Sequence, residues 1–152
     1  MDDQKFIIPS VGKLASRLEP LAIPILRVIV GLVFIYHGWP KLSGVLSGDG
    51  LAGLVGFIEP SGLPFPIVLA WLALITEFFG GISLVLGLWT RLWAFLGAGQ
   101  MFLIVFFVKG FGEVHYARGG FEYDLVLAVV LSVLFVVGAG GMSLDSKMKK
   151  TF

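Results

Sequence analysis

Apolar residues run through the chain in long blocks rather than in the alternating pattern of half-buried strands. Four blocks cover residues 21–36, 67–89, 92–108 and 125–141, and leucine, valine, isoleucine, phenylalanine and glycine dominate them. About 17 to 25 apolar residues suffice for a helix to cross a membrane, whereas the strands of a barrel would alternate polar and apolar positions. The pattern therefore predicts an all-α membrane protein, a bundle of four transmembrane helices.

Two shorter segments have helical periodicity and are predicted to lie at the membrane surface. Residues 11–18 place apolar side chains on one helical face and basic side chains on another. Residues 1–20 are thus expected to be a cytoplasmic N-terminal segment that forms an interfacial helix, with a flexible tail as the alternative. An apolar stripe in residues 51–58 predicts a second short helix at the outer interface, where it would serve as a lid.

The distribution of positive charge predicts how the bundle is oriented. With both termini inside, seven Lys and Arg residues lie on the cytoplasmic side and three lie outside. Because cytoplasmic segments carry the excess of positive charge, we expect both termini in the cytoplasm of a bacterial cell, with the chain in the inner membrane. Residues 21–141 would form the transmembrane domain, and residues 142–152 a basic cytoplasmic tail. No small-x-small cleavage site follows the first block, so its span is expected to be retained.

Composition narrows the possible chemistry. The chain of 152 residues is 57% hydrophobic, its mean hydropathy is +0.97, and it contains no cysteine. Without cysteine there is no disulfide relay, iron–sulfur cluster or covalently attached c-type haem, so any redox role must use a borrowed cofactor. A net charge of +1 provides no basic face for nucleic acid. We expect no covalently bound cofactor and no nucleic-acid partner.

A polar site is predicted inside the membrane. Glu77 lies near the middle of the second block, and Gln100 is expected at a similar depth in the third. A lone carboxylate at that depth costs about 2.5 to 3.5 kcal/mol, so Glu77 should face the bundle interior and be protonated or paired. Arg27, about six residues inside the first block, is the expected partner. Interhelical hydrogen bonding alone would also explain such a site, and a centre that accepts protons or polarises a ligand is the functional alternative.

A second polar cluster is predicted at the outer face. His37 and Lys41 come at the end of the first block, where Pro40 is expected to end the helix. His115 and Glu122 lie on the loop before the fourth block, at the same membrane face. Histidine next to carboxylates can exchange protons near neutral pH, so proton exchange or quinone contact is one interpretation, and a solvated loop is the other. No dense spacing of ligands predicts a metal or haem.

Together these features resemble the DoxX family of small bacterial membrane proteins. The matching segments run in order through residues 20–146: RVIVG at 27–31, HGWPKL at 37–42, GLPFP at 62–66, EFFGG at 77–81, GLWTR at 87–91, and GAGGMSLD at 138–145. The resemblance implies a four-helix membrane protein associated with sulfur metabolism, respiratory chains and oxidative-stress defence. The related DoxD-type proteins are implicated as the membrane subunit of a thiosulfate:quinone oxidoreductase.

Two functions are compatible with these observations. The chain could be a membrane accessory subunit that holds a quinone while a soluble redox partner supplies electrons, which would make it an oxidoreductase subunit rather than an independent enzyme. Alternatively, it is a non-enzymatic anchor or assembly factor for soluble redox enzymes. A small transporter is the less favoured third reading, because four spans without an inverted repeat would require a homo-oligomer.

Overall fold

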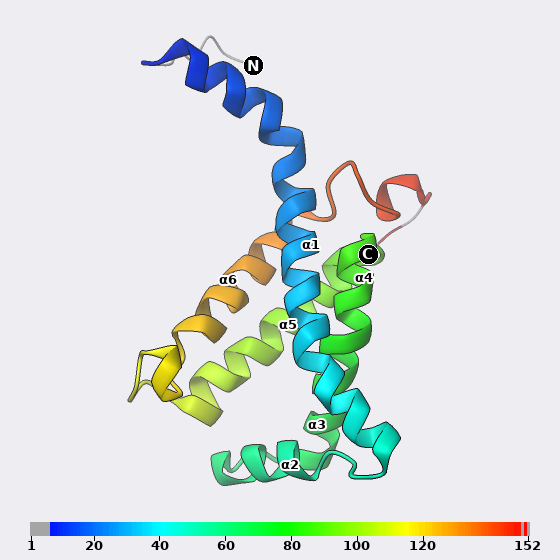
Figure 1. The fold of residues 1–152 in the computed structure, drawn as a ribbon, viewed down its shortest axis with the longest axis vertical. Helices are drawn as coiled ribbons and strands as arrows, with labels where there is room; N and C mark the ends of the chain where they lie inside the picture. The colour runs from blue at the N-terminus through cyan, green and yellow to red at the C-terminus, as the bar shows by residue number, and fades with distance from the viewer. Residues whose placement is uncertain (1–6, 150, 152) are drawn as a thin grey trace.

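The computed structural model describes residues 7–149 and 151, and these residues form only helices, turns and loops (Figure 1). Four helical arms make up the body of the protein. They are α1 (Pro9–Ser47), the continuous arm of α3 (Pro66–Leu74), η2 (Ile75–Gly80) and α4 (Gly81–Leu86), the arm of α5 (Thr90–Leu103) and η3 (Ile104–Lys109), and α6 (Glu122–Val137). The segments η2 and η3 are π-helical. The predicted all-α bundle is confirmed.

Short helices connect these arms. The connection from α1 to α3 contains α2 (Ala52–Ile58) and the 3₁₀ turn η1 (Glu59–Ser61), as the apolar stripe predicted. Leu51 and Ile58 of this stripe are buried in a small cluster with Ala70 and Leu74 of α3. The 3₁₀ turn η4 (Tyr116–Arg118) precedes α6, and η5 (Asp145–Lys147) follows it. The α2 segment therefore folds back onto the bundle.

Three of the arms are long and apolar enough to cross a membrane. They are Pro9–Ser47, Pro66–Leu86 and Thr90–Lys109. The fourth arm, α6, has 16 residues and packs along α5. It ends at Val137 rather than at the predicted residue 141, because Gly138 has a φ of 87° that no continuing helix adopts.

Helix α1 is a single rod, bent in Figure 1, that begins before the first apolar block and ends after it. The helix predicted within residues 1–20 is continuous with the span from Pro9 onward, and residues 1–6 lie outside the described residues. The prediction that Pro40 ends the helix is wrong, because α1 continues to Ser47. Pro40 has no backbone N–H to donate to the preceding turn. The Lys41 ammonium donates a hydrogen bond to the nearby His37 carbonyl at 2.9 Å.

The backbone of α1 packs directly against the backbone of the second arm. A Cβ on Gly31 would lie 2.7 Å from the Gly81 carbonyl oxygen, and a Cβ on Gly81 would lie 2.8 Å from the Gly31 carbonyl oxygen. Seven residues along α1, a Cβ on Gly38 would lie 2.6 Å from the Phe78 backbone nitrogen. Glycine permits this approach where lipid provides no hydrophobic drive between helices.

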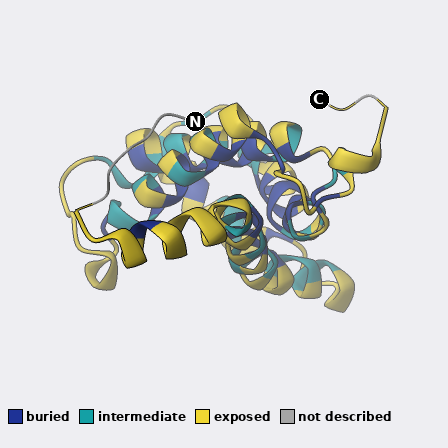
Figure 2. Cartoon of the chain, turned by 90° about the horizontal axis from the view of Figure 1, so that it is seen from above, coloured by how far each residue is buried: buried dark blue, intermediate teal, exposed yellow. Residues whose placement is uncertain are grey.

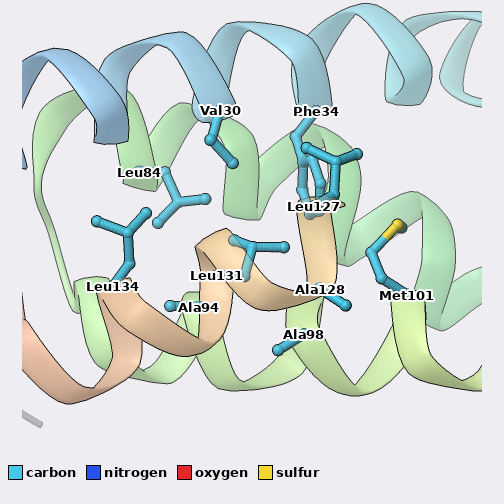
Figure 3. Close-up of a cluster of buried hydrophobic side chains, with 10 residues drawn as sticks. All are labelled: Val30, Phe34, Leu84, Ala94, Ala98, Met101, Leu127, Ala128, Leu131 and Leu134. Atoms are coloured by element: carbon cyan, nitrogen blue, oxygen red, sulfur yellow. The ribbon is translucent and has the colours of Figure 1, made fainter. Parts of the chain in front are cut away.

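The main core lies where all four arms meet. Val30 and Phe34 of α1 point toward Leu84 of α4 and toward a row of side chains from α5 and α6 (Figure 3). Burial follows the same arrangement, with buried residues toward the interior and exposed residues on the outer faces of the helices (Figure 2). The exposed apolar faces are those that a bilayer would cover.

Candidate functional site

A cavity of about 330 Å³ lies between all four arms and the α2 segment. Its volume is at the lower end of the roughly 300 to 1,000 Å³ typical of ligand pockets. Most of its lining is apolar and includes Phe34, Leu54, Phe57 and Met101. Its charged side chains fall in two groups, which we call the first pole (Lys41, Glu77, Gln100) and the second pole (Lys109, Asp124, Tyr116). The polar side chains of His37, Thr76 and Tyr123 also line it. An apolar cavity with a few convergent polar groups is the usual form of a small-molecule site.

The first pole is centred on the carboxylate of Glu77. The Lys41 ammonium contacts Glu77 Oε2, and Gln100 Nε2 donates to Glu77 Oε1 at 2.6 Å. The Glu77 side chain is 7% exposed and the Lys41 side chain 19%. Glu77 and Gln100, which the sequence places at similar depths, are in contact, and the carboxylate is paired as its depth requires.

Arg27 does not belong to this pole, so its expected pairing with Glu77 is wrong. Its guanidinium donates to the carbonyl oxygens of Leu84 at 2.7 Å, Val85 at 3.3 Å and Met142 at 2.8 Å. Arg27 and Lys41 are separated by 14 residues of one helix, which is about 21 Å along its axis. The second arm runs antiparallel to α1, so Arg27 meets the end of α4 while Lys41 meets η2.

Arg27 instead stabilises the junction between α4, α5 and the C-terminal segment. The carbonyls at a helix C-terminus carry partial negative charge, which favours a cation there. Asp145 accepts hydrogen bonds from the backbone nitrogens of Trp89 at 2.7 Å and Thr90 at 2.9 Å, and so caps the start of α5. Gly87 lies in the turn between α4 and α5, where a Cβ would be 2.1 Å from Arg27 Nη1. The segments 27–31, 87–91 and 138–145 singled out in the sequence thus meet at one structural junction.

The predicted outer-face cluster separates into two parts. His37 lines the cavity with Lys41, and its ring centroid lies 6.3 Å from that of Tyr123. His115 is 71% exposed and lies outside the cavity lining, with Nδ1 3.4 Å from Glu122 Oε1. Glu122 also accepts a hydrogen bond from the Tyr116 backbone nitrogen at 3.0 Å. His115 and Glu122 therefore order the loop, whereas His37 and Lys41 belong to the site.

The second pole contains an ion pair that the sequence analysis did not identify. Lys109 Nζ lies 2.6 Å from Asp124 Oδ2, donates to the Gly120 carbonyl at 3.0 Å, and stands 5.5 Å from the centroid of the Tyr116 ring. The Lys109 and Asp124 side chains are 15% and 12% exposed. The sequence did contain a signal for this pair. Lys109 directly follows the third apolar block, and Asp124 directly precedes the fourth at the same membrane face.

Both poles are built on π-helical segments. Glu77 lies in η2 and Lys109 lies in η3, and each pairs with a residue of a different helix, Lys41 of α1 or Asp124 of α6. A π-helical turn inserts an extra residue and shifts which side chains face the interior, and such turns are frequent at functional sites. The two irregular segments thus bring charged groups to a cavity that regular helices would line with apolar residues.

The arrangement favours binding of an apolar molecule with polar groups. Ammonium groups donate hydrogen bonds to carbonyl oxygens, and the carboxylates accept protons or hydrogen bonds. The imidazole of His37 makes no hydrogen bond within the described part of the chain, so it is available to a ligand. Within that part, no group of three or more His, Asp or Glu side chains is arranged to hold a metal ion.

Known proteins show the same family relationship. The sequence pattern of the DoxX family matches residues 22–110. The inner membrane protein YqjF of Escherichia coli is 26% identical over 89% of this chain and 98% of its own length. An uncharacterized protein of Haemophilus influenzae is 35% identical over 89% of this chain and 96% of its own length. A protein of Bacillus subtilis named "Putative oxidoreductase CatD" is 29% identical over 80% of this chain and 82% of its own length.

No solved structure matches this chain. The family pattern covers more than half of the chain and includes α1 from residue 22, the whole second arm and all of α5 and η3. It therefore contains Lys41, Glu77 and Gln100 of the first pole, and of the Arg27 junction it contains segments 27–31 and 87–91. The chain is a membrane protein and belongs to the DoxX family.

Proposed function

We propose that this protein is a membrane accessory subunit that binds a quinone for a redox system, either quinone-linked sulfur oxidation or oxidative-stress defence. The observation that carries the proposal is the cavity, in which an apolar lining meets the paired Lys41 and Glu77. A quinone combines an apolar ring with carbonyl oxygens, which matches both parts of the lining. The name of the B. subtilis relative supports a redox context.

The cavity residues would act on the quinone's protons rather than on its electrons. Reduction of a quinone to a quinol takes up two electrons and two protons. In our proposal, a soluble partner protein that oxidises a sulfur compound or another reductant supplies the electrons. Lys41 donates a hydrogen bond to a quinone oxygen, Glu77 holds the Lys41 ammonium in position, and His37 exchanges protons with the outer aqueous side.

The proposed setting is the bacterial inner membrane, with both termini in the cytoplasm. The named E. coli relatives are inner membrane proteins, which supports this location. The cavity would then lie toward the outer face, since Lys41 and Lys109 are on the side of the chain opposite the termini. Electrons and protons would reach the cavity from that side.

Quinone binding by the purified protein tests the proposal. Detergent-solubilised protein is titrated with 2,3-dimethyl-1,4-naphthoquinone by calorimetry, and the heat from empty micelles is subtracted. Glu77→Gln should weaken binding at least about tenfold, because Lys41 loses the carboxylate that holds it in position, and a hydrogen bond from a charged donor contributes about 1.5 to 3 kcal/mol. Since the chain has no cysteine, thiol addition to the quinone cannot produce a false signal.

Glu19→Gln is the matched control, because it makes the same chemical change at an exposed residue of α1 outside the cavity lining. Its affinity should equal that of the unchanged protein. A protein that gives no more heat than empty micelles, or equal binding by the Glu77→Gln variant, would refute the proposal. In that case, cross-linking that captures the same soluble partners with the unchanged protein and with Glu77→Gln would establish the anchor function instead.

A further inference from the structure

The cavity lining contains two ion pairs, and His37 and Tyr123 line it as well. Lys41, Glu77 and Gln100 come from α1, η2 and α5, and Lys109, Asp124 and Tyr116 come from η3, α6 and η4. The two ion pairs share no residue and no hydrogen bond. Apolar side chains such as Met101 and Leu127 also line the cavity. A ligand with a single polar end would meet only one ion pair. The other ion pair would then face the apolar part of the ligand.

Burying an ion pair against an apolar surface is costly unless further hydrogen bonds compensate. Lys109 already has two acceptors, Asp124 and the Gly120 carbonyl, and its ammonium carries a third hydrogen. The Tyr116 ring, whose centroid lies 5.5 Å from Lys109 Nζ, adds a favourable cation–π contact. Lys41 likewise has two acceptors, the His37 carbonyl and Glu77. Each ammonium therefore keeps one donor for a ligand in the cavity.

From this geometry we propose that the cavity takes a ring with oxygens on opposite edges, and that Lys109 at the second pole binds the second oxygen. The ligand class is a para-dicarbonyl ring, with one carbonyl at Lys41 and the other at Lys109. This inference rests on the proposed function and makes it more specific. Lys109 becomes a specificity-determining residue, with Asp124 as the positioning residue that orients it.

The test compares a dicarbonyl with a matched monoketone. Affinities for 2,3-dimethyl-1,4-naphthoquinone and 2,3-dimethyl-1-tetralone are measured for the unchanged protein and for Lys109→Met/Asp124→Leu. The double variant removes both charges, so neither is left buried without a partner. The quinone preference over the ketone should fall by about tenfold, the value of one lost charged hydrogen bond. Ketone affinity should stay nearly constant, because its single oxygen can still be held at Lys41.

Two further variants keep the result interpretable. Lys109→Gln/Asp124→Asn retains an amide pair at the second pole and should lose only part of the preference, and it replaces the first variant if that one does not fold. Glu19→Gln, at an exposed position outside the cavity lining, should keep the full preference. An unchanged preference in both second-pole variants overturns the inference while leaving quinone binding intact. Failure of the unchanged protein to bind the quinone overturns this inference and the proposed function together.

Discussion

The buried charges of Arg27 and Glu77 are compensated by different kinds of hydrogen-bond partner. Arg27 is 2% exposed and donates only to backbone carbonyls, with its Nε lacking a partner within the described residues. Glu77 is 5% exposed and is paired with an ammonium and an amide. The first solution depends on the fork of a guanidinium, which reaches carbonyls from two chain segments at once. The second leaves donors and acceptors at a cavity wall, as a binding site requires.

Arg27→Lys should destabilise the protein, although the charge is kept. A single ammonium cannot span the carbonyls of Leu84 and Met142, so at least one buried acceptor loses its donor. We expect a loss of about 2 to 3 kcal/mol in the free energy of unfolding, measured by denaturant titration in mixed micelles. Arg17→Lys, at an exposed position of the same helix, should leave the unfolding free energy unchanged. Equal stability of both variants would contradict the junction described above.

Among the elements, α1 determines how the site is assembled. Its buried positions Arg27, Gly31, Phe34 and Gly38 follow one another at intervals of three or four residues, and Lys41 continues the same stripe. Because the helix does not stop at Pro40, this stripe reaches η2 and brings Lys41 to Glu77. The glycines in the stripe set the distance between the helices, and that distance determines whether the ion pair forms.

Gly38→Ala should therefore disturb both stability and the first pole. A Cβ there would lie 2.6 Å from backbone atoms of Phe78, and backbone cannot move as a flexible side chain can. Overpacking of this kind costs about 1 to 3 kcal/mol, and α1 should move away from η2. Thermal unfolding in detergent measures the cost, and quinone titration measures the effect on the site.

Gly99→Ala is the control for that variant. Gly99 is a helical residue of α5 with open space around its Cα, and alanine in a helix is favoured over glycine by about 0.5 to 1 kcal/mol. The control should unfold at the same or a slightly higher temperature and bind the quinone normally. A Gly38→Ala protein as stable as this control would show that α1 and η2 are not in close backbone contact.

At the scale of the whole molecule, the two ends of the bundle have different roles. The end that contains Arg27, Asp145 and the α4–α5 turn is held by hydrogen bonds between these two side chains and the backbone. The opposite end contains the cavity, the α2 segment and the ordered loop before α6. Conformational rigidity at one end and a ligand cavity at the other suit a protein that exchanges its ligand on one side of the membrane.

The proposed orientation predicts which segments face the outer aqueous side and which face the cytoplasm. The chain lacks cysteine, so single cysteines can be introduced without altering the rest of the protein. The two variants are Gly112→Cys, in the loop before α6, and Lys149→Cys, near the C-terminus. Both positions are exposed. In intact cells a membrane-impermeant maleimide should label the first variant and not the second, which should react only after permeabilisation. The reverse labelling pattern would invert the orientation and place the cavity on the cytoplasmic side.

The sequence alone determined the class of fold and the depth of Glu77. Long apolar blocks can be satisfied in lipid only as helices, and counting residues along a helix gives a depth, so neither conclusion needed tertiary contacts. Glu77 and Gln100, which residue counting places at similar depths, are joined by a hydrogen bond in the structure. The short helix after the first block was predicted for a similar reason, because its apolar stripe had to be buried.

Only the tertiary structure decided which charges meet. Lys41 rather than Arg27 pairs with Glu77 because α1 passes through Pro40 and because glycine contacts set the register of the antiparallel second arm. The second pole depends on the π-helical segment η3 and on how α6 lies against α5, and helical periodicity predicts neither. A residue count places a side chain along the membrane normal, whereas its partner depends on the rotation and register of neighbouring helices, which arise from packing across the whole bundle.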